Sequence, residues 1–360
     1  MTPRPVLPRW QISSFAATIG ASVAAILLAA GDAADTAIFG VAALAMIGLA
    51  WVVGLATEQL AATSGPKLSA ILNAAFGNVA ELVLVLLAVH EGLGDVAKAA
   101  IAGSVLGNAL FVLGLAFALG GLRNGTQRFN REIAGLNAVL LAVAVLGLVV
   151  PTVFAETAAP SDDRLQGLSD AVSIVFLVLY ALFVTYYLRG GDGSEHDAGH
   201  HDVELVPWSR KVALTVLLAA GAGVAVLGDI LVGSLEPAAE SIGVSPVFMG
   251  LIAVPVIGNL AEHMVAVQLA WRNRMDFSLN IAMGSTLQIV LFMAPVIVLL
   301  SPLLADGVPL TFSFFELTAL AGGAVAFGLV AADGESNWVE GAALVGVYLV
   351  VALTALFWPA

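Results

Sequence analysis

Two glutamates stand inside long apolar stretches of the sequence, each at the end of the same short motif. The motif Gly-Asn-x-Ala-Glu occupies residues 77–81 and again residues 258–262, where His263 follows it. A carboxylate at bilayer depth costs about 2.5–3.5 kcal/mol unless it faces a partner or a polar cavity, so Glu81 and Glu262 are candidate functional residues. Two carboxylates that meet in a low dielectric need a divalent cation or protons for neutrality. The pair therefore predicts a site where a divalent cation and protons exclude each other, which is the chemistry of an exchanger.

Further polar residues repeat in step with the glutamates. Ser104 and Ser285 each follow a motif glutamate by 23 residues and each belongs to a Gly-Ser pair. Asn108 lies four residues after the first serine and Gln288 three after the second, so each pair shares one face of a helix. Their hydroxyl and amide oxygens, with the carboxylates, suit calcium better than zinc, and manganese remains a candidate. The alternative role for these four side chains is hydrogen bonding between helices.

The backbone near the second motif is expected to be irregular. Pro255 lacks a backbone N–H and Gly258 permits a bend, so we expect a broken helix at this point. Carbonyls freed by such a break, near residues 254–256 and the corresponding residues 73–75, can bind a cation.

Three side chains adjoin the glutamates. Asn78 and Asn259 either bind the cation directly or satisfy backbone groups beside the preceding glycine. His263 points roughly 100 degrees away from Glu262 on a helix, which favours a proton relay or a supporting role beside the site over direct binding. A packing hydrogen bond between helices is the alternative role for this histidine.

Three more acidic residues require an explanation. Glu58 and Glu240 precede the motif glutamates by 23 and 22 residues, and either attract cations to the two mouths of the site or are solvated helix ends. Glu316 lies inside an apolar segment and has no counterpart in the other half, so it receives no role from the sequence.

The composition places these residues in an α-helical membrane protein. Of the 360 residues, 60% are hydrophobic and 11% are charged, and apolar runs near twenty residues recur along the chain. Such runs can span a bilayer as helices and are too long for barrel strands, so we expect an all-α polytopic membrane protein with eleven transmembrane helices. The expected spans are residues 12–30, 36–57, 67–90, 96–121, 133–151, 168–188, 209–233, 245–270, 277–301, 311–332 and 337–358.

The positions of lysine and arginine predict the orientation. With the N-terminus in the cytoplasm, eleven of the 13 basic residues lie on the cytoplasmic side of a cell membrane. The two motifs then run in opposite directions, which indicates inverted repeats. The predicted parts are an N-terminal helix in residues 1–30, a five-helix repeat in 31–189, a cytoplasmic linker in 190–208 and a second five-helix repeat in 209–360.

Two segments allow a second interpretation. The first span is either a retained helix or a signal peptide, because Arg4 and Arg9 precede an apolar core that ends in small residues. The linker is either a solvated connection or a regulatory cation or pH sensor. The sensor would use the linker's acidic and histidine side chains, Asp192, Glu195, His196, Asp197, His200 and His201.

Several function classes are excluded or disfavoured. The net charge of −13, with few and scattered basic residues, excludes nucleic acid as a partner and leaves membrane lipid as the expected surroundings. The absence of cysteine excludes disulfides and thiolate metal sites. No H-E-x-x-H motif and no facing Ser, His and Asp set is present, so an intramembrane enzyme is disfavoured. No resident cofactor is expected, because calcium and protons would be cargo.

On these residues the sequence resembles the calcium/proton exchangers, the CAX branch of the calcium/cation antiporter superfamily. The resemblance is carried by residues 77–81, by residues 258–263 and by the Gly-Ser helices that follow, and it extends over almost the whole chain. It implies exchange of Ca²⁺ for H⁺ by alternating access, with Glu81 and Glu262 as the transporting carboxylates. The sodium/calcium branch usually carries a further acid where this chain has Gln288, which favours protons over sodium. Exchange that uses sodium, or that carries manganese, is the alternative.

Overall fold

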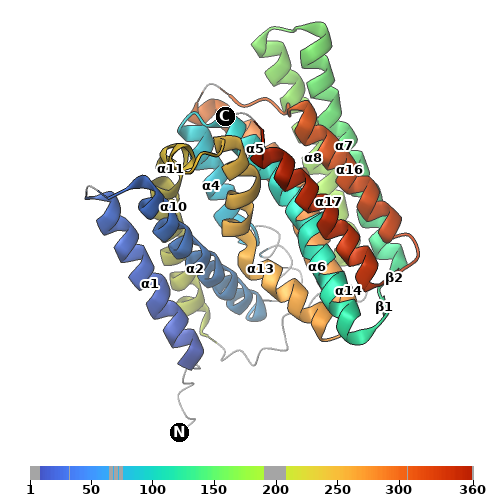
Figure 1. Ribbon diagram of the computed structural model, residues 1–360, viewed down its shortest axis with the longest axis horizontal. Coiled ribbons are helices and arrows are strands. Elements are labelled where there is room, and N and C mark those ends of the chain that lie inside the picture. The colour runs from blue at the N-terminus through green and yellow to red at the C-terminus, as the bar shows by residue number, and fades with distance from the viewer. Residues whose placement is uncertain are drawn as a thin grey trace.

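Helices make up almost all of the computed structural model, which describes residues 9–31, 33–64, 68, 72, 76–189, 208–305 and 307–358. The all-helical, multi-pass architecture expected from the composition is confirmed (Figure 1). The linker predicted at residues 190–208, except Trp208, and the carbonyls at 73–75 lie outside the described residues.

The elements follow the chain in this order. The first half contains α1 (Arg9–Ala29), α2 (Asp35–Ala62), α4 (Val79–His90), α5 (Gly94–Leu106), the π-helix η1 (Gly107–Val112), α6 (Leu113–Asn124), the strand β1 (Gln127–Arg128), α7 (Arg131–Ala158) and α8 (Asp162–Arg189). The second half contains α10 (Arg210–Gly233), α11 (Leu235–Ile242), α12 (Pro246–Phe248), the π-helix η2 (Met249–Ala253), α13 (Val254–Trp271), α14 (Met275–Gln288), the π-helix η3 (Ile289–Met293), α15 (Ala294–Leu304), α16 (Phe314–Val330), the strand β2 (Glu335–Ser336) and α17 (Trp338–Leu356).

The described residues include nine helices that are long and apolar enough to cross a membrane. Two shorter apolar helices, Val79–His90 and Phe314–Val330, fall within the spans expected at residues 67–90 and 311–332. The count of eleven transmembrane helices and their grouping into two inverted repeats remain predictions.

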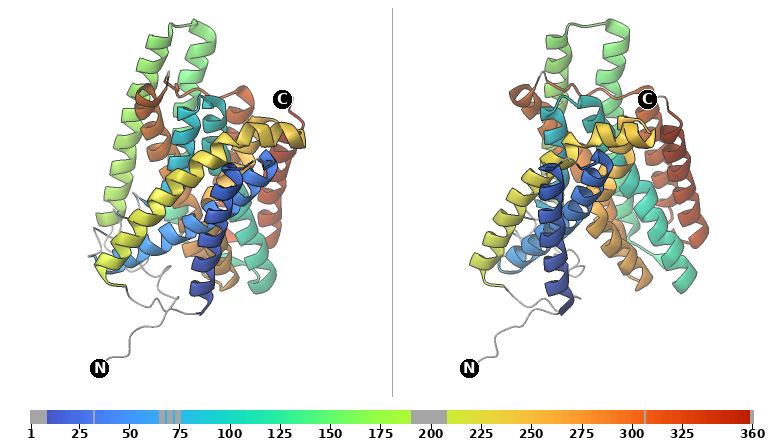
Figure 2. Two further views of the ribbon diagram at one scale, coloured as in Figure 1. Left: turned by 90° about the vertical axis from the view of Figure 1, so that its left-hand side faces the viewer. Right: turned by 60° about the vertical axis from the view of Figure 1, so that its left-hand side comes forward.

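The hairpin of α7 and α8 is longer than expected. The sequence predicts that the first of these helices ends at residue 151, but α7 continues through Pro151 to Ala158, and α8 begins at Asp162 instead of residue 168. A proline is tolerated within a membrane helix when neighbouring groups satisfy the freed backbone. The two ends project beyond the rest of the bundle (Figure 2).

The expected break at Gly258 is wrong. Helix α13 runs without interruption from Val254 to Trp271, and α12, η2 and α13 together form one continuous helix, Pro246–Trp271, in which Pro255 comes two residues after the π segment. The irregular backbone lies just before it, in η2. Two further π-helical segments, η1 and η3, begin three residues after Ser104 and four after Ser285. Short π segments inside α-helices occur frequently at functional sites.

Helices α4, α5 and α13 occupy the middle of the bundle. Figure 1 shows α1, α2 and α10 on one side of them and α6, α7, α8, α14, α16 and α17 on the other. Hydrophobicity does not drive association between helices in lipid, so close packing of small residues must contribute. Gly103 of α5 provides such a contact, because a Cβ there would lie 1.9 Å from the carbonyl oxygen of Leu251 in η2. A Cβ added at Gly250 of η2 would likewise lie 2.7 Å from the Val96 carbonyl oxygen of α5.

The contact between α5 and η2 yields a stability prediction. We expect Gly103→Ala to force the two segments apart and to destabilise the protein by about 1–3 kcal/mol, the usual cost of overpacking. The measurement is the thermal melting temperature of purified protein in detergent. Gly107→Ala is the matched control, because nothing lies within 4 Å of a Cβ at that position. Equal melting temperatures for the two variants would contradict the prediction.

Candidate functional site

The Glu81 carboxylate lies in the first turn of α4 and is completely buried. The Ser104 hydroxyl, from α5, donates a hydrogen bond to its Oε1 atom. The Asn259 side-chain amide, from α13, donates to Oε2 at 2.9 Å. One carboxylate is therefore held by polar groups from two other helices, one in each half of the chain.

Gly258 allows this approach of α4 to α13. A Cβ at Gly258 would lie 3.2 Å from the Cβ of Glu81, which is tighter than ordinary van der Waals contact. Glu262 follows Gly258 by four residues and so lies one turn further along the same face of α13. It is half-buried. The second motif glutamate is thus on the side of α13 that contacts the first.

A second series of hydrogen bonds runs beside Glu81. His263 Nε2 lies 3.0 Å from Asn108 Oδ1, and the Asn108 amide donates to Ser285 Oγ at 3.1 Å. The Ser285 hydroxyl donates in turn to Asn78 Oδ1 at 3.2 Å. Because the Asn108 oxygen faces the imidazole, Nε2 is the protonated nitrogen in this arrangement. The series connects α13, η1, α14 and the start of α4.

Most of the candidate residues from the sequence are brought together and removed from water. Asn78 is the N-cap residue of α4, yet its side chain makes no capping hydrogen bond and instead accepts from Ser285. Gln288, the last residue of α14, is also buried. We call the following group the polar cluster. Its members are all at most 9% exposed: Asn78, Glu81, Ser104, Asn108, Asn259, His263, Ser285 and Gln288.

The two proposed mouth residues have different surroundings. Glu58 is half-buried near the C-terminal end of α2, whereas Glu240 is exposed on the short helix α11. In Figure 1, α11 lies at the upper end of the bundle and α2 ends toward the lower end. The two acids therefore belong to opposite ends of the molecule.

The chemistry of the cluster favours a hard cation. Among the described residues, no three His, Cys, Asp or Glu side chains form a metal-binding group. Apart from the His263 imidazole, the available ligands in the cluster are carboxylate, amide and hydroxyl oxygens, which are the donors that calcium prefers. Zinc prefers several nitrogen or sulfur ligands, and the cluster has only the one imidazole.

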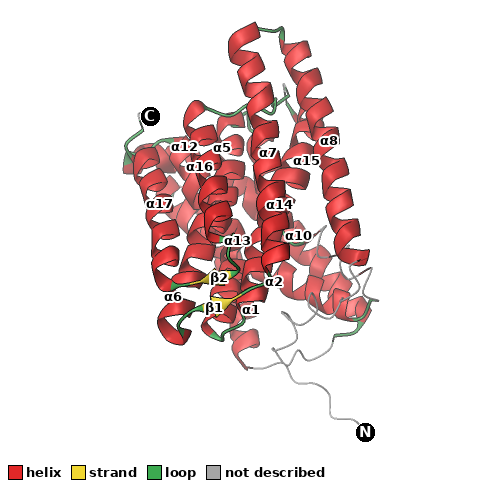
Figure 3. Cartoon of the chain, turned by 90° about the vertical axis from the view of Figure 1, so that its right-hand side faces the viewer, coloured by secondary structure: helices red, strands yellow, loops and turns green. Residues whose placement is uncertain are grey.

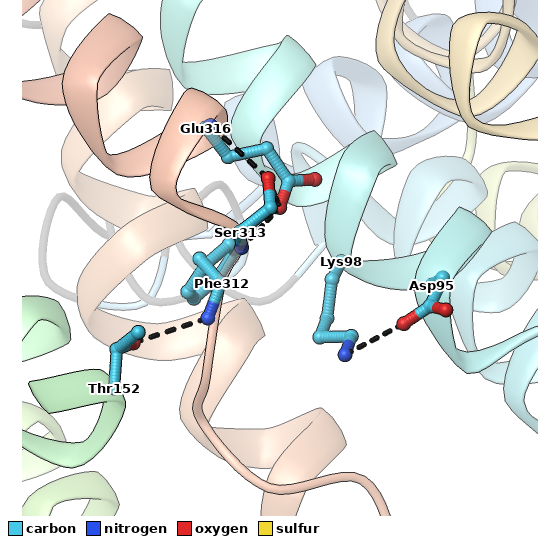
Figure 4. Close-up of polar contacts among 6 residues, drawn as sticks. All are labelled: Asp95, Lys98, Thr152, Phe312, Ser313 and Glu316. Atoms are coloured by element: carbon cyan, nitrogen blue, oxygen red, sulfur yellow. Dashed lines mark hydrogen bonds and ion pairs between the residues drawn. The ribbon is translucent and has the colours of Figure 1, made fainter. Parts of the chain in front are cut away.

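Glu316, which the sequence left without a role, has a structural one. It is the third residue of α16, and Ser313 is the N-cap. The Ser313 N–H and hydroxyl both donate to Glu316 Oε2 at 2.8 Å, and the Glu316 N–H donates to Ser313 Oγ at 3.2 Å (Figure 4). This reciprocal arrangement is a capping box, which satisfies the free N–H groups at a helix start. The sequence Ser-x-x-Glu before an apolar run was a readable signal for it.

Comparison with known proteins adds the family. Residues 34–189 and 212–357 match the family model described as "Sodium/calcium exchanger protein". A Ca(2+)/H(+) antiporter of Aphanothece halophytica is 40% identical over 340 residues, which cover 90% of this chain and 91% of the relative. The Ca(2+)/H(+) antiporter ChaA of Bacillus subtilis (strain 168) is 39% identical over 320 residues, which cover 88% of this chain and 91% of the relative.

Solved structures agree with this result. The structure of native YfkE has a TM-score of 0.82 and 34% identity, and the match covers 95% of this chain and 99% of that one. The H+/Ca2+ exchanger CAX has a TM-score of 0.72 at 16% identity, which shows a likeness of fold alone. The resemblance to calcium/proton exchangers that the motifs indicate is therefore confirmed.

The capping box yields a prediction that separates structure from chemistry at Glu316. Glu316→Ala removes the cap and is expected to destabilise the protein by about 1 kcal/mol, whereas Glu316→Gln keeps a capping side chain and is expected to be close to wild type. Thermal melting of the two purified variants is the measurement. If the glutamine variant melts as early as the alanine variant, the carboxylate does more than cap α16.

Proposed function

Because the chain belongs to the sodium/calcium exchanger protein family, we propose that it is a secondary antiporter that exchanges Ca²⁺ for H⁺ across the membrane. The observation that carries the proposal is the buried Glu81 carboxylate, held between the two halves of a chain whose relatives are named Ca(2+)/H(+) antiporters. Since those relatives are antiporters, we class the chain with the transporters and not with the enzymes.

Glu81 and Glu262 are the proposed shared carboxylates. In support, Gly258 brings α13 against Glu81, and Glu262 lies one turn further on the same face. Calcium takes six to eight oxygen ligands in flexible geometry. Beside the two carboxylates, the proposed ligands are the side-chain oxygens of Asn78, Asn259, Ser104, Asn108, Ser285 and Gln288.

The hydrogen bonds to Glu81 suit both cargoes. The Ser104 hydroxyl donates to the carboxylate, but a hydroxyl rotates freely and can turn a lone pair toward a cation. The Asn259 side chain carries an amide donor and a carbonyl acceptor, so it can serve a charged carboxylate or a bound ion. The same side chains can therefore face either a proton-loaded or a calcium-loaded site.

Coupling follows from charge balance in a dry site. Two ionised carboxylates without a counter-charge are costly in a low dielectric. One Ca²⁺ or two H⁺ each restores neutrality, and the two cannot occupy the same oxygens together. Because the unneutralised pair is the state of highest energy, the site crosses between faces loaded with one cargo or the other. Exchange at this site alone would be one calcium for two protons.

His263 is proposed to support the site or to relay protons. Its Nε2 contacts Asn108, which contacts Ser285, so the imidazole orients two ligand side chains. Histidine is also the side chain whose ordinary pKa permits proton transfer near neutral pH. Substitution of His263 would distinguish a change in calcium affinity from a change in proton coupling.

The proposed cycle is alternating access in a cell membrane, with the N-terminus in the cytoplasm. The matched positions of η1 and η3 after Ser104 and Ser285 support duplicated halves, and the arginines gathered at one end support the orientation. Glu58 and Glu240, at opposite ends, would raise the local cation concentration at the two mouths. The solvated or sensing role of the 190–208 linker stays a prediction.

The principal test is transport by purified protein in liposomes. With an acidic interior, we expect uptake of Ca²⁺, and we expect Glu81→Gln and Glu262→Gln each to reduce uptake to that of protein-free liposomes, because one carboxylate cannot balance a divalent ion. Glu316→Gln is the matched control, since it neutralises another buried membrane glutamate that caps a helix. Exchange by both motif variants would refute the shared-carboxylate site.

The same liposomes test the alternative exchangers. Uptake of calcium driven by a sodium gradient, without a pH gradient, would support sodium as the counter-ion. Uptake of manganese in preference to calcium would support manganese as the cargo.

Competition between cargoes gives a second prediction. Lowering the pH on the side where calcium binds should raise the half-saturating Ca²⁺ concentration and leave the maximal rate unchanged, because protons occupy the same oxygens. The shift should be about 10-fold to 100-fold per pH unit, according to whether one or two protons compete. Initial rates at several calcium concentrations and pH values provide the measurement. A half-saturating concentration that does not change with pH would contradict a common site.

A further inference from the structure

The segment that follows α6 contacts the C-terminal end of α13, at the arginine-rich end of the molecule. The side-chain amide of Gln127 donates to the Ala270 carbonyl and to Asn273 Oδ1, both at 2.9 Å. The side-chain amide of Asn124 donates to the carbonyls of Ala270 and Trp271 at 3.2 and 3.3 Å. We call this contact, between residues 124–130 and residues 270–276, the clasp. The last carbonyls of a helix have no partner within the helix. The Ala270 carbonyl also accepts from the Asn273 N–H at 3.0 Å, so the first half of the chain adds its side chains to the cap of a helix of the second half.

Gln127 is fixed within the clasp. It is only 1% exposed, although it belongs to a two-residue strand at the end of the bundle. Gly120 of α6 makes room for it, because a Cβ at that glycine would lie 2.0 Å from Gln127 Oε1 and 3.0 Å from the Ala270 oxygen. The side chain therefore fills a space between α6 and α13 that a side chain at position 120 would close.

The segment is also held on its other side. Strand β1 pairs antiparallel with β2 (Figure 3). Gln127 is therefore opposite Ser336 and Arg128 is opposite Glu335, and Arg128 and Glu335 form an ion pair of 3.1 Å. The Asn130 N–H donates to Asp276 Oδ1 in the first turn of α14. The clasp thus joins the connections that lead into α7, α14 and α17.

The two helices that meet at the clasp carry half of the polar cluster. The helix from Gly94 to Asn124 is continuous and contains Ser104 and Asn108, and α13 contains Asn259 and His263. At the other side of the cluster, Gly103 of α5 touches Leu251 of η2, directly before α13. These two contacts, one on each side of the cluster, therefore fix the axial position of α13 relative to α5 and α6.

Small axial displacements would matter at the cluster. One residue of an α-helix corresponds to a rise of about 1.5 Å, whereas a hydrogen bond tolerates only a few tenths of an ångström around its best length. A displacement of α13 by one residue would break the bonds from Asn259 to Glu81 and from His263 to Asn108, which measure 2.9 and 3.0 Å.

We propose that Gln127 is a positioning residue for the cation site. By holding the end of α13 against α6, it keeps Asn259 and His263 in register with Ser104 and Asn108. It also makes α6 and α13 one rigid unit throughout the transport cycle. The inference rests on the proposed function, because the affinity for calcium is the property that this register sets.

The first test is the calcium dependence of exchange. Gln127→Ala should raise the half-saturating Ca²⁺ concentration roughly tenfold, as expected when a group that orients the ligands is removed. The maximal rate per folded transporter should stay within about twofold of wild type, because the liganding side chains remain. Gln166→Ala is the matched control, since Gln166 also donates a 2.9 Å side-chain hydrogen bond, to Asp170 within α8. A variant that yields less folded protein but has an unchanged half-saturating concentration would overturn the proposal.

A cross-link supplies the decisive second test, because the chain contains no cysteine. The Arg123 guanidinium, next to the clasp in the sequence, lies 4.8 Å from the centre of the ring of Trp271, which belongs to the clasp, and both side chains are exposed. Arg123→Cys and Trp271→Cys can be joined by a short bifunctional thiosulfonate, which avoids the strict geometry of a direct disulfide. Joining them in otherwise wild-type protein should leave exchange unchanged, and joining them in the Gln127→Ala background should restore the wild-type calcium dependence.

The outcomes separate the two proposals. If the cross-link stops exchange in otherwise wild-type protein, α6 and α13 separate during transport and the clasp is not a fixed contact. If the cross-link fails to restore calcium affinity in the Gln127→Ala background, Gln127 does not act by holding α13 in axial register with α6. Wild-type protein that exchanges no calcium would refute the proposed function, and this inference with it. Normal wild-type exchange with an unaffected Gln127→Ala variant would overturn the positioning role alone.

Discussion

The burial of one carboxylate within the membrane region constrains the rest of the structure. Glu81 has no exposed surface, and its two oxygens accept hydrogen bonds from Ser104 and Asn259. A charged group in such a place is stable only when polar partners or counter-ions satisfy it. Those partners come from different helices, so α4, α5 and α13 must approach more closely than large side chains would allow. Gly258 at Glu81 and Gly103 at Leu251 meet this need directly.

The π-helical segments belong to the same requirement. On a regular helix, Ser104 and Asn108 would lie one turn apart on one face. In the structure, Ser104 serves Glu81, while Asn108, within η1, serves Ser285 and His263. The π segment begins at Gly107, between Ser104 and Asn108. Its counterpart η3 follows Ser285 and Gln288, the residues that carry the corresponding groups in the second half.

Much of this arrangement could be predicted from the residues, and the exceptions have physical causes. Apolar length predicts a membrane helix well, and the repeated motif identified the side chains that form the cluster. Hydropathy misplaced the start of α8, because its first turn contains Asp162 and Asp163 and extends beyond the apolar region. The pair of Pro255 and Gly258 was interpreted as a break, but the helix continues through both residues, and its irregular turn is the π segment η2, which ends two residues before Pro255. No local sequence pattern predicts the π segments. None predicts the proposed role of Gln127 either, since that role depends on a contact with Ala270, which is 143 residues away in the sequence.

Rigidity at the site has a direct bearing on coupling. In the proposed antiporter, calcium and protons compete because the two carboxylates bind the same calcium ion. If Glu81 and Glu262 could separate, each would become an isolated acid that a single proton or a monovalent cation neutralises, and the requirement for joint neutralisation would disappear. Partially loaded sites could then cross the membrane, and calcium flux would lose its fixed relation to proton flux. Contacts that keep α13 in register with α5 and α6, such as those of Gln127 and Gly103, therefore contribute to the stoichiometry of exchange although they touch neither ion. An exchanger of this kind requires a stiff site within a moving protein, because the energetic penalty on the empty pair enforces coupling only while the two charges stay together.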